Sequence, residues 1–380
     1  MTKILQVAAI DKTIYKFILP LMKKLKENNY EVICVCSDTG SSGLIRKEGF
    51  KVYNINIDRK ISPVSNIKTI RNIFKIIKNE KINIVHTHTP IASVLGRIAA
   101  KIAKVDKVIY TAHGLYLNSK IFYYIEKYMI KYFTDYIFTV NNEDYNLAIK
   151  EKFCHEDKIK NINGVGINIE KFSPDKIDSN VREEFNIKEK HIVIGFIGRI
   201  VKEKGILDLV KAYGKIQNEY GNTKLLIVGP DNLNERDNNT REEIDKLIKH
   251  HDIKESVIFI GYRDDIPEIL KGMDIFVLPS YREGMPVSLL EAMSMELPVI
   301  GTDIRGSREE ITKDTGVIYS PGDIDGLANS LEIILKDMKK AKEMGKSARK
   351  RVTNHFSEEH VLEKQMEVFK NLKWGNRLCL

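Results

Sequence analysis

Short apolar runs alternate with amphipathic stretches along almost the whole chain, and this alternation limits the fold more than any other feature. The runs that we predict as strands in the first half are residues 4–9, 31–37, 52–55, 84–86, 107–111 and 136–140. Helical patterns lie between them, among others at 17–28, 67–79, 92–103 and 144–152. Strands that alternate with helices predict an α/β fold, with a parallel sheet covered by helices on both faces. In such sheets, ligands bind beyond the carboxyl ends of the strands.

The same pattern starts again near residue 192 and predicts a second sheet of the same kind. Its strands are expected at 192–197, 225–228, 257–260, 275–278, 299–301 and 316–318, and its helices at 206–220, 241–250 and 324–336. A chain of 380 residues is also longer than one hydrophobic core usually serves. We therefore expect two Rossmann-like domains whose parallel sheets face each other across a cleft.

The predicted boundaries follow from the restart of the pattern. Residues 1–168 form the first domain, and residues 169–357 form the second. Two glycines, a proline and several polar residues at 163–175 mark a hinge. Residues 358–380 are predicted as a C-terminal helix that packs back on the first domain.

Positive charge is concentrated in the first domain. Residues 1–168 contain 27 Lys and Arg against 15 Asp and Glu, whereas the remaining 212 residues contain 34 against 37. Such an excess suits nucleic acid, an anionic membrane or a phosphate-bearing substrate, and of these we expect the last two and no nucleic acid. Lysine used only as a solubilising residue is the alternative interpretation. No run approaches the roughly 18 apolar residues of a spanning helix, and no signal peptide is evident, so we expect a cytoplasmic protein.

The stretch PSYREGMPVSLLEAM at 279–293 carries the most chemical information. It follows a predicted strand, turns at Gly284 and enters a helix near Pro286, a residue that the first helical turn tolerates. The N–H groups at the start of that helix lack helical partners and suit ligand oxygens. These groups belong to Met285, Val287 and Ser288.

Two glutamates in this stretch and two cations elsewhere complete the pattern. Glu283 lies in the loop and Glu291 about one turn into the helix, so that both can face one ligand. Arg199 and Lys204 follow the strand at 192–197 and precede a helix. Two cations beside a helix N-terminus can neutralise a diphosphate leaving group as its charge grows.

Together these stretches resemble the retaining glycosyltransferases of family 4, which have two Rossmann-like domains in the GT-B arrangement. The family's Glu-x7-Glu motif matches Glu283 and Glu291, and its phosphate-binding Arg and Lys match Arg199 and Lys204. The resemblance covers nearly the whole chain and is strongest from about residue 190 to 325. It includes the stretches VGP at 228–230, FIGYR at 259–263, DIFVLPS at 274–280 and GTD at 301–303.

The resemblance implies that residues 1–168 bind the acceptor and residues 169–357 bind the donor. It also implies a role for each matching residue. Glu283 would hold hydroxyls of the donor sugar, and Glu291 would hold the ribose hydroxyls. Arg199 and Lys204 would bind the diphosphate. The other expected donor-binding positions are Tyr262 and Arg263 beside the nucleobase, with Gly284, Met285, Pro286 and Val287 at the helix start.

The first domain supplies three candidate histidines. His113 follows a predicted strand, and the resemblance implies that it lies near the transferred sugar and affects catalysis; a hydrogen-bonded structural histidine is the alternative. His86 and His88 end another strand, where contact with the acceptor or a structural role is expected. A metal site is not expected there because no third ligand is evident. GT-B enzymes generally work without a bound metal, so we expect neither a metal nor another cofactor.

The sequence KIFYYIEKYMIKYF at 120–133 combines aromatic residues with lysines. Basic amphipathic segments of this kind can lie in a membrane interface. A core helix with an ordinary solvated face is the other interpretation. Because the first domain is basic, membrane contact at the inner face of the cell membrane is favoured.

These features predict a retaining transferase of hexosyl or N-acetylhexosaminyl groups. Its donor is a nucleoside-diphosphate sugar, expected to be a UDP-sugar. Its acceptor is expected to be a hydroxyl of a polyprenyl-diphosphate-linked glycan in the synthesis of a cell-surface polysaccharide. Two alternatives stay open, a nucleotide-sugar epimerase of GT-B fold and a non-catalytic protein that binds a sugar nucleotide.

Overall fold

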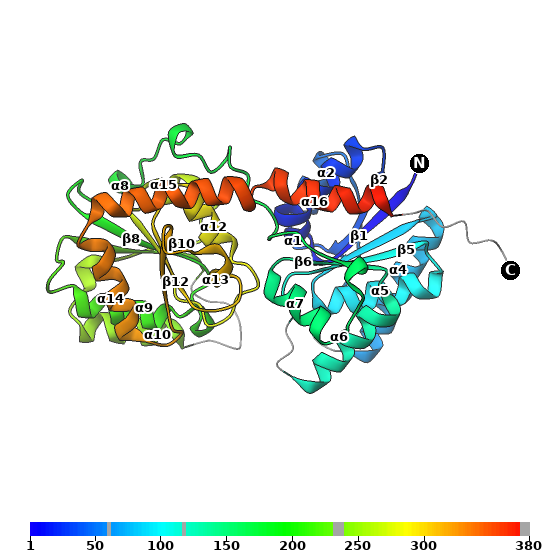
Figure 1. Ribbon diagram of the computed structural model, residues 1–380, viewed down its shortest axis with the longest axis horizontal. Helices are drawn as coiled ribbons and strands as arrows, with labels where there is room; N and C mark the ends of the chain where they lie inside the picture. Colours follow the sequence, from blue (N-terminus) through cyan, green and yellow to red (C-terminus); the bar gives the residue numbers. More distant parts are fainter. Residues whose placement is uncertain (59–61, 116–118, 231–238, 373–380) are drawn as a thin grey trace. The chain divides into compact units, whose positions relative to one another are not determined.

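The computed structural model of the chain describes residues 1–58, 62–115, 119–230 and 239–372. It divides into two compact units, shown in Figure 1. Unit 1 contains Met1–Gly166 together with Glu358–Leu380, and unit 2 contains Ile167–Ser357. The first division therefore falls two residues before the boundary that the sequence pattern suggested.

Unit 1 is built on a seven-stranded parallel sheet with the strand order β3-β2-β1-β4-β5-β6-β7. The strands are β1 (Lys3–Ile10), β2 (Glu31–Ser37), β3 (Lys51–Asn54), β4 (Ile84–His88), β5 (Lys107–Ala112), β6 (Tyr136–Thr139) and β7 (Ile159–Asn161). The helical segments are α1 (Asp11–Thr13), η1 (Ile14–Ile18), α2 (Leu19–Glu27), α3 (Ser42–Lys47), α4 (Pro63–Glu80), α5 (Pro90–Ala103), α6 (Lys120–Phe133), α7 (Asn142–Lys150), η2 (Glu156–Lys158) and α16 (Glu358–Asn371). The sequence analysis missed β7 because three residues are too few for a periodicity to show.

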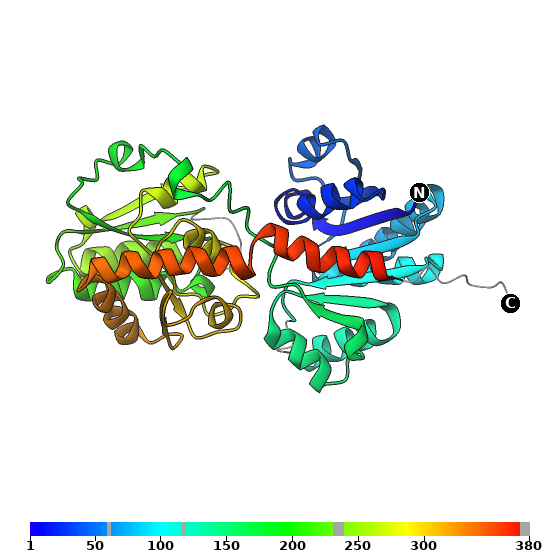
Figure 2. The same cartoon turned by 45° about the horizontal axis from the view of Figure 1, so that its top comes forward.

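Helices cover both faces of this sheet, as Figure 1 shows. Side chains from α2 and α16 pack on one face, and side chains from α4 and α5 pack on the other. The last helix returns to unit 1 over the strands (Figure 2), and Phe369 from α16 is completely buried among residues of β1, β4, β5 and β6. Burial on both faces explains why the strands read as continuous apolar runs.

The first helix of unit 1 is less regular than the pattern at 17–28 predicted. Helical structure begins already at Asp11, widens into a π-helical segment at Ile14–Ile18 and continues as α2. Pro20 explains the irregularity, because its nitrogen cannot donate a hydrogen bond to the preceding turn. A widened turn accommodates such an interruption within a continuous helix.

Unit 2 contains a six-stranded parallel sheet with the strand order β10-β9-β8-β11-β12-β13. The strands are β8 (Ile192–Ile197), β9 (Thr223–Val228), β10 (Val257–Gly261), β11 (Ile275–Leu278), β12 (Val299–Thr302) and β13 (Gly316–Tyr319). The helical segments are η3 (Pro174–Lys176), α8 (Val181–Glu184), η4 (Lys202–Lys204), α9 (Ile206–Ile216), α10 (Thr240–His250), η5 (Lys254–Ser256), α11 (Ile266–Lys271), α12 (Val287–Ser294), α13 (Ser307–Glu310), α14 (Ile324–Leu335) and α15 (Met338–His355).

The order of these strands locates the place where a ligand can bind. From β8 the chain proceeds to β9 and β10 on one side of the sheet, then returns to add β11, β12 and β13 on the other side. The strand order therefore reverses between β8 and β11, and ligands of open parallel sheets bind at the carboxyl ends of the two strands at such a switch point. In Figure 1, α9, α10 and α14 lie on one side of the sheet and α12 and α15 on the other.

One hydrophobic core holds unit 2 together; it contains buried side chains from five of the six strands, and partly buried side chains of β10 pack against it. Among the described residues of both units, no helix is long and apolar enough to cross a bilayer.

Candidate active site

The loops that follow β8 and β11 are held against each other at the switch point of the unit 2 sheet. Gly205 has a positive φ of 69°, and a side chain there would meet the carbonyl oxygen of Pro279 at 1.9 Å, so only glycine allows the approach. The N–H of Tyr281 donates to the carbonyl oxygen of Glu203 over 2.9 Å. The Tyr281 hydroxyl also donates to the carboxylate of Asp208 on α9. These contacts fix the relative position of the two loops.

Glu283 is the centre of the resulting polar cluster. Its Oε1 accepts hydrogen bonds from the Ser280 hydroxyl, at 2.7 Å, and from the Lys204 ammonium. The side chains of Glu283 and Lys204 are only 12% and 20% exposed, so the ion pair is largely shielded from water. The structure therefore brings together two residues that lie 79 positions apart and that the sequence analysis assigned to one site.

Arg199 follows β8 at the same switch point of the sheet. Its backbone is fixed on both sides, because Gly198 N–H donates to Val228 O over 2.9 Å and Ile200 N–H donates to Pro230 O over 3.1 Å. Gly229 packs so closely on the Gly198 carbonyl that a side chain on it would lie 1.8 Å away. The Arg199 side chain is exposed. A cation on a rigid backbone with an exposed head suits an anionic ligand.

The start of α12 places the rest of the motif. Pro286 is the N-cap residue, Val287 begins the helix, and Glu291 follows one turn later with a partly exposed side chain. The first N–H groups of the helix have no carbonyl partner within it, so they are available to ligand oxygens. Arg305 donates from Nε to the carbonyl oxygen of Glu283 over 3.4 Å and supports the loop from the other side.

The two residues expected beside the nucleobase follow β10 at one edge of the sheet. Arg263 is held by two carboxylates, with Nη1 at 2.6 Å from Glu184 Oε1 and Nη2 at 2.6 Å from Asp265 Oδ2. The Tyr262 hydroxyl donates to Asp264 Oδ1 over 2.5 Å, and half of its side chain is exposed. Both ends of the Arg263 guanidinium are thus engaged by protein carboxylates.

One buried acid behind the Glu283 loop was not anticipated. Glu310 on α13 is completely buried, and neither carboxyl oxygen has a hydrogen-bond partner among the described residues. Burial raises the pKa of Glu310 well above its usual 4.5, and the negative charge of Glu283 raises it further. Arg351 donates from Nε to the backbone oxygen of Glu310, over 2.8 Å, and not to its carboxyl group. Burial of Glu310 without a hydrogen-bond partner among the described residues thus favours the uncharged form of its carboxyl group.

The candidate histidines of unit 1 form a cluster at the carboxyl ends of β4 and β5. His88 Nδ1 lies 3.3 Å from His113 Nε2, and His88 Nε2 lies 2.9 Å from Gln6 Oε1. With the Gln6 oxygen facing His88, that Nε2 carries the proton, so His88 Nδ1 accepts from the Nε2–H of His113. His88, Thr111 and His113 line a cavity of about 20 Å³, which has room for one water molecule.

His86 and His88 are more deeply placed than the sequence analysis expected. His86 is 0% exposed, packs against Phe138 and Phe369, and lies 2.7 Å from the Thr111 hydroxyl. We expected either contact with the acceptor or a structural role, and β4 extends to His88, so that His86 lies within the strand and in the core. His88 is 2% exposed and contacts the less deeply buried His113.

Burial also keeps these rings neutral. It lowers the pKa of His86 to about 3 and that of His113 to about 4, and it holds the pKa of His88 well below the usual 6.5. The positive charge that a protonated His113 would carry contributes to the lowered pKa of His86 and His88. A neutral His113 can offer one hydrogen-bond donor or acceptor to a ligand but no charge.

The sequence analysis overlooked two residues that position candidate side chains, Ser280 beside Glu283 and Gln6 beside His88. Ser280 lies three residues before Glu283, and its hydroxyl adds a second hydrogen bond to the carboxylate. Gln6 interrupts the apolar sequence of β1, and a polar residue at such a position indicates a buried polar partner, which is His88. Among the described residues, no three His, Cys, Asp or Glu side chains lie where they could hold a metal ion.

Two Rossmann-like units, with a cationic and acidic cluster at the switch point of the second sheet, define a glycosyltransferase of the GT-B fold. The solved structure of Alr3699/HepE of Anabaena in complex with UDP and glucose has this fold too, with a TM-score of 0.85 over 98% of this chain and 100% of that one, at 18% identity.

Comparison with known sequences gives the family. Residues 178–351 match the family of glycosyl transferases group 1, and residues 3–141 match the glycosyl transferase 4-like family. The UDP-Gal:alpha-D-GlcNAc-diphosphoundecaprenol alpha-1,3-galactosyltransferase of Escherichia coli is 30% identical over 88% of this chain and 87% of its own. The capsular polysaccharide biosynthesis glycosyltransferase CapM of Staphylococcus aureus is 30% identical over 95% of both chains. The chain belongs to the family 4 glycosyltransferases.

Proposed function

We propose that the enzyme transfers a sugar from a UDP-sugar to a hydroxyl of a polyprenyl-diphosphate-linked glycan, with retention of the anomeric configuration. The observation that carries the proposal is the shielded pair of Lys204 and Glu283 at the switch point of the unit 2 sheet. A lone cation or a lone acid would fit many ligands. A cation beside a carboxylate suits a ligand that combines phosphate oxygens with sugar hydroxyls, as a nucleotide sugar does.

In this proposal each residue of the unit 2 cluster binds a different part of the donor. Lys204 and Arg199 hold the diphosphate, and Glu283 accepts hydrogen bonds from sugar hydroxyls. Glu291 accepts them from the ribose. The first N–H groups of α12 add donors for the developing charge, since a helix N-terminus favours anions.

The reaction breaks the bond between the anomeric carbon and the donor phosphate oxygen, and its electron pair stays on the departing UDP. The acceptor hydroxyl oxygen forms the new bond to the anomeric carbon on the same face. Its proton passes to the departing phosphate. Arg199, Lys204 and the α12 N–H groups stabilise the growing charge in place of a metal ion.

The polyprenyl-diphosphate acceptor is supported by the relative from Escherichia coli, whose name gives a diphosphoundecaprenol-linked sugar as its acceptor. The excess of positive charge in residues 1–168 also suits a diphosphate-bearing substrate and an anionic membrane surface. We place the acceptor in unit 1, with neutral His113 beside the transferred sugar, and the enzyme at the inner face of the cell membrane.

A donor panel tests this proposal. UDP-, GDP- and ADP-linked hexoses and N-acetylhexosamines are supplied with a short-chain prenyl-diphosphate-linked sugar, and the product is analysed by mass and by the coupling constant of its anomeric proton. We expect one UDP-sugar to give a product one sugar heavier with the donor's configuration. An inverted product would overturn the retaining mechanism, and a changed UDP-sugar in the absence of acceptor would indicate an epimerase.

A further inference from the structure

The outward face of α6 carries an unusual set of large apolar side chains. Ile121, Tyr124 and Tyr128 are 70%, 67% and 56% exposed. Four of the exposed residues follow one another at helical spacing and form a continuous stripe along the helix. The stripe consists of Ile121, Ile125, Tyr128 and Tyr132, with Tyr124 and Phe122 beside it.

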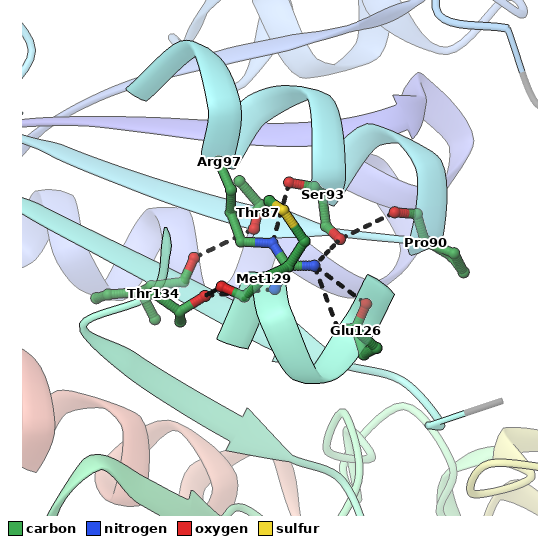
Figure 3. Close-up of polar contacts among 8 residues, drawn as sticks. Thr87, Pro90, Ser93, Arg97, Glu126, Met129 and Thr134 are labelled. Carbon is green, nitrogen blue, oxygen red and sulfur yellow. Dashed lines mark hydrogen bonds and ion pairs between the residues drawn. The ribbon is translucent and has the colours of Figure 1, made fainter. Parts of the chain in front are cut away.

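The inward face of α6 is fixed by a buried arginine on α5 (Figure 3). Arg97 is completely buried, and its Nη2 lies 3.2 Å from both carboxylate oxygens of Glu126. Its Nη1 donates to the Thr134 hydroxyl just beyond the helix, over 3.3 Å. Losing either partner of a buried ion pair leaves an uncompensated charge, so this contact holds α6 in one orientation. The stripe therefore faces outward as part of the fold.

The segment of the chain that leads to α6 and includes it is strongly basic. Residues 63–133 contain twelve Lys and Arg against three Asp and Glu, an excess of nine. On α6 itself, the lysines are Lys120, Lys127 and Lys131, and the one acid, Glu126, is paired inward with Arg97. Lys131 lies 5.3 Å from the centre of the Tyr132 ring, so cations and aromatic rings alternate along the surface.

We propose that the stripe on α6 docks on an anionic lipid bilayer, an inference that builds on the lipid-linked acceptor proposed above. A contiguous apolar patch on a soluble unit marks an interaction site. Interfaces between proteins are depleted in lysine, whereas tyrosine and lysine together are typical of the headgroup region of a membrane. The lysines would meet lipid phosphates, and the rings would enter the boundary with the acyl chains.

Docking through α6 would bring a membrane-bound acceptor close to His113, because α6 follows His113 closely in the chain. Lys120 lies seven positions after His113, and a chain of that length spans at most about 25 Å. A bilayer in contact with α6 therefore lies near the carboxyl end of β5. There, a diphosphate at headgroup level could present its sugar to the histidine cluster.

Vesicle sedimentation tests the surface, with phosphatidylcholine vesicles alone and with about 30% phosphatidylglycerol. We expect the whole enzyme to bind only the anionic vesicles, and to be released when the salt concentration rises from about 0.05 M to about 0.5 M. The triple variant Ile121→Ser/Tyr124→Ser/Tyr128→Ser should bind at least about tenfold more weakly. The variant Lys120→Glu/Lys131→Glu should lose at least about 25-fold, since each lysine contributes roughly fivefold.

Matched substitutions on unit 2 are the controls. Ile333→Ser removes a residue that is 60% exposed on α14, and Lys339→Glu/Lys342→Glu reverses two exposed lysines on α15. Both controls should bind vesicles as the unchanged enzyme does. Thermal melting shows whether each variant is folded. If the triple variant does not fold, the variant Lys120→Glu/Lys131→Glu alone tests the proposal.

Three results would overturn the docking proposal: no binding of the unchanged enzyme to anionic vesicles, binding that neither α6 variant weakens, or a dimer in solution that the triple variant converts to a monomer. The last would assign the stripe to a second copy of the chain. Sugar transfer to a short water-soluble acceptor separates this proposal from the proposed function. The α6 variants should keep that activity, and an enzyme that binds vesicles but transfers no sugar would contradict only the function.

Discussion

The ammonium group of Lys204 and the carboxylate of Glu283 form an ion pair across two loops that belong to neighbouring strands, β8 and β11. The pair depends on the strand order, because β8 and β11 are adjacent in the sheet although β9 and β10 lie between them in the chain. It also depends on Gly205, which lets the β8 loop approach Pro279. The fold thus creates a polar site that neither loop would hold alone.

Removing either cation of this site should slow sugar transfer. We expect Arg199→Ala and Lys204→Ala each to lower kcat/KM by about 10²- to 10³-fold, because each would lose charge stabilisation of the departing diphosphate. Lys202→Ala is the matched control, since Lys202 is paired with Glu243 at 2.6 Å. Initial rates with a UDP-sugar and a short lipid-linked acceptor give the comparison. Equal losses for all three variants would mean that general positive charge, not position, matters.

Removing divalent cations should leave the reaction intact. The charges that stabilise the departing diphosphate in this proposal come from Arg199, Lys204 and the start of α12. After dialysis against EDTA we expect the transfer rate to stay within about twofold of the untreated rate. A large loss that Mg²⁺ or Mn²⁺ restores would contradict the proposed neutralisation by protein groups.

The buried acid Glu310 predicts a pH effect on stability. Its pKa is raised in the folded protein, so the stability it contributes is present below about pH 4.5 and is lost as pH rises toward the folded pKa. Glu310→Gln cannot ionise. In denaturant unfolding, the free energy of unfolding of Glu310→Gln should therefore rise relative to that of the unchanged protein. The expected rise is about 1.4 kcal/mol for each pH unit between 4.5 and the raised pKa of the folded protein. A constant difference between pH 4 and pH 8 would show that burial does not raise the pKa of Glu310.

The buried histidine His86 predicts an effect of the opposite sign. The pKa of His86 is about 3 in the folded protein, lower than the usual 6.5. The stability that the neutral ring contributes is therefore present above pH 6.5 and is lost as pH falls toward 3. Relative to His86→Phe, the free energy of unfolding of the unchanged protein should fall by about 1.4 kcal/mol per pH unit in that range. Replacing His155, an exposed histidine, provides the control. Parallel curves for His86→Phe and the unchanged protein would contradict a neutral buried ring.

Much of the fold could be predicted because strands of a doubly covered parallel sheet are apolar throughout, and the helices between them have a clear period. The β8 and β11 boundaries, Ile192–Ile197 and Ile275–Leu278, agree with the sequence pattern. The membership of Arg199, Lys204, Glu283 and Glu291 in one unit could be predicted from motif spacing. Their contacts could not, because these depend on strand order and loop approach.

The sequence could not reveal which polar residues are buried. Arg97 reads as an ordinary helix surface residue, and only the structure shows its partner Glu126, 29 residues away on another helix. His86 reads as the end of a strand, but β4 runs two residues further and places it beneath α16. Both cases involve contacts between distant segments, which local periodicity does not record.

The most direct test measures both UDP binding and sugar transfer in the variant Glu283→Ala. Isothermal titration with UDP and rate measurements with the UDP-sugar are made on Glu283→Ala and on the unchanged enzyme. If Glu283 holds the sugar and the cations hold the diphosphate, Glu283→Ala should bind UDP within about threefold of the unchanged enzyme and lose at least about a hundredfold in transfer rate. An unchanged transfer rate in Glu283→Ala, with UDP binding retained, would contradict the assignment of the site.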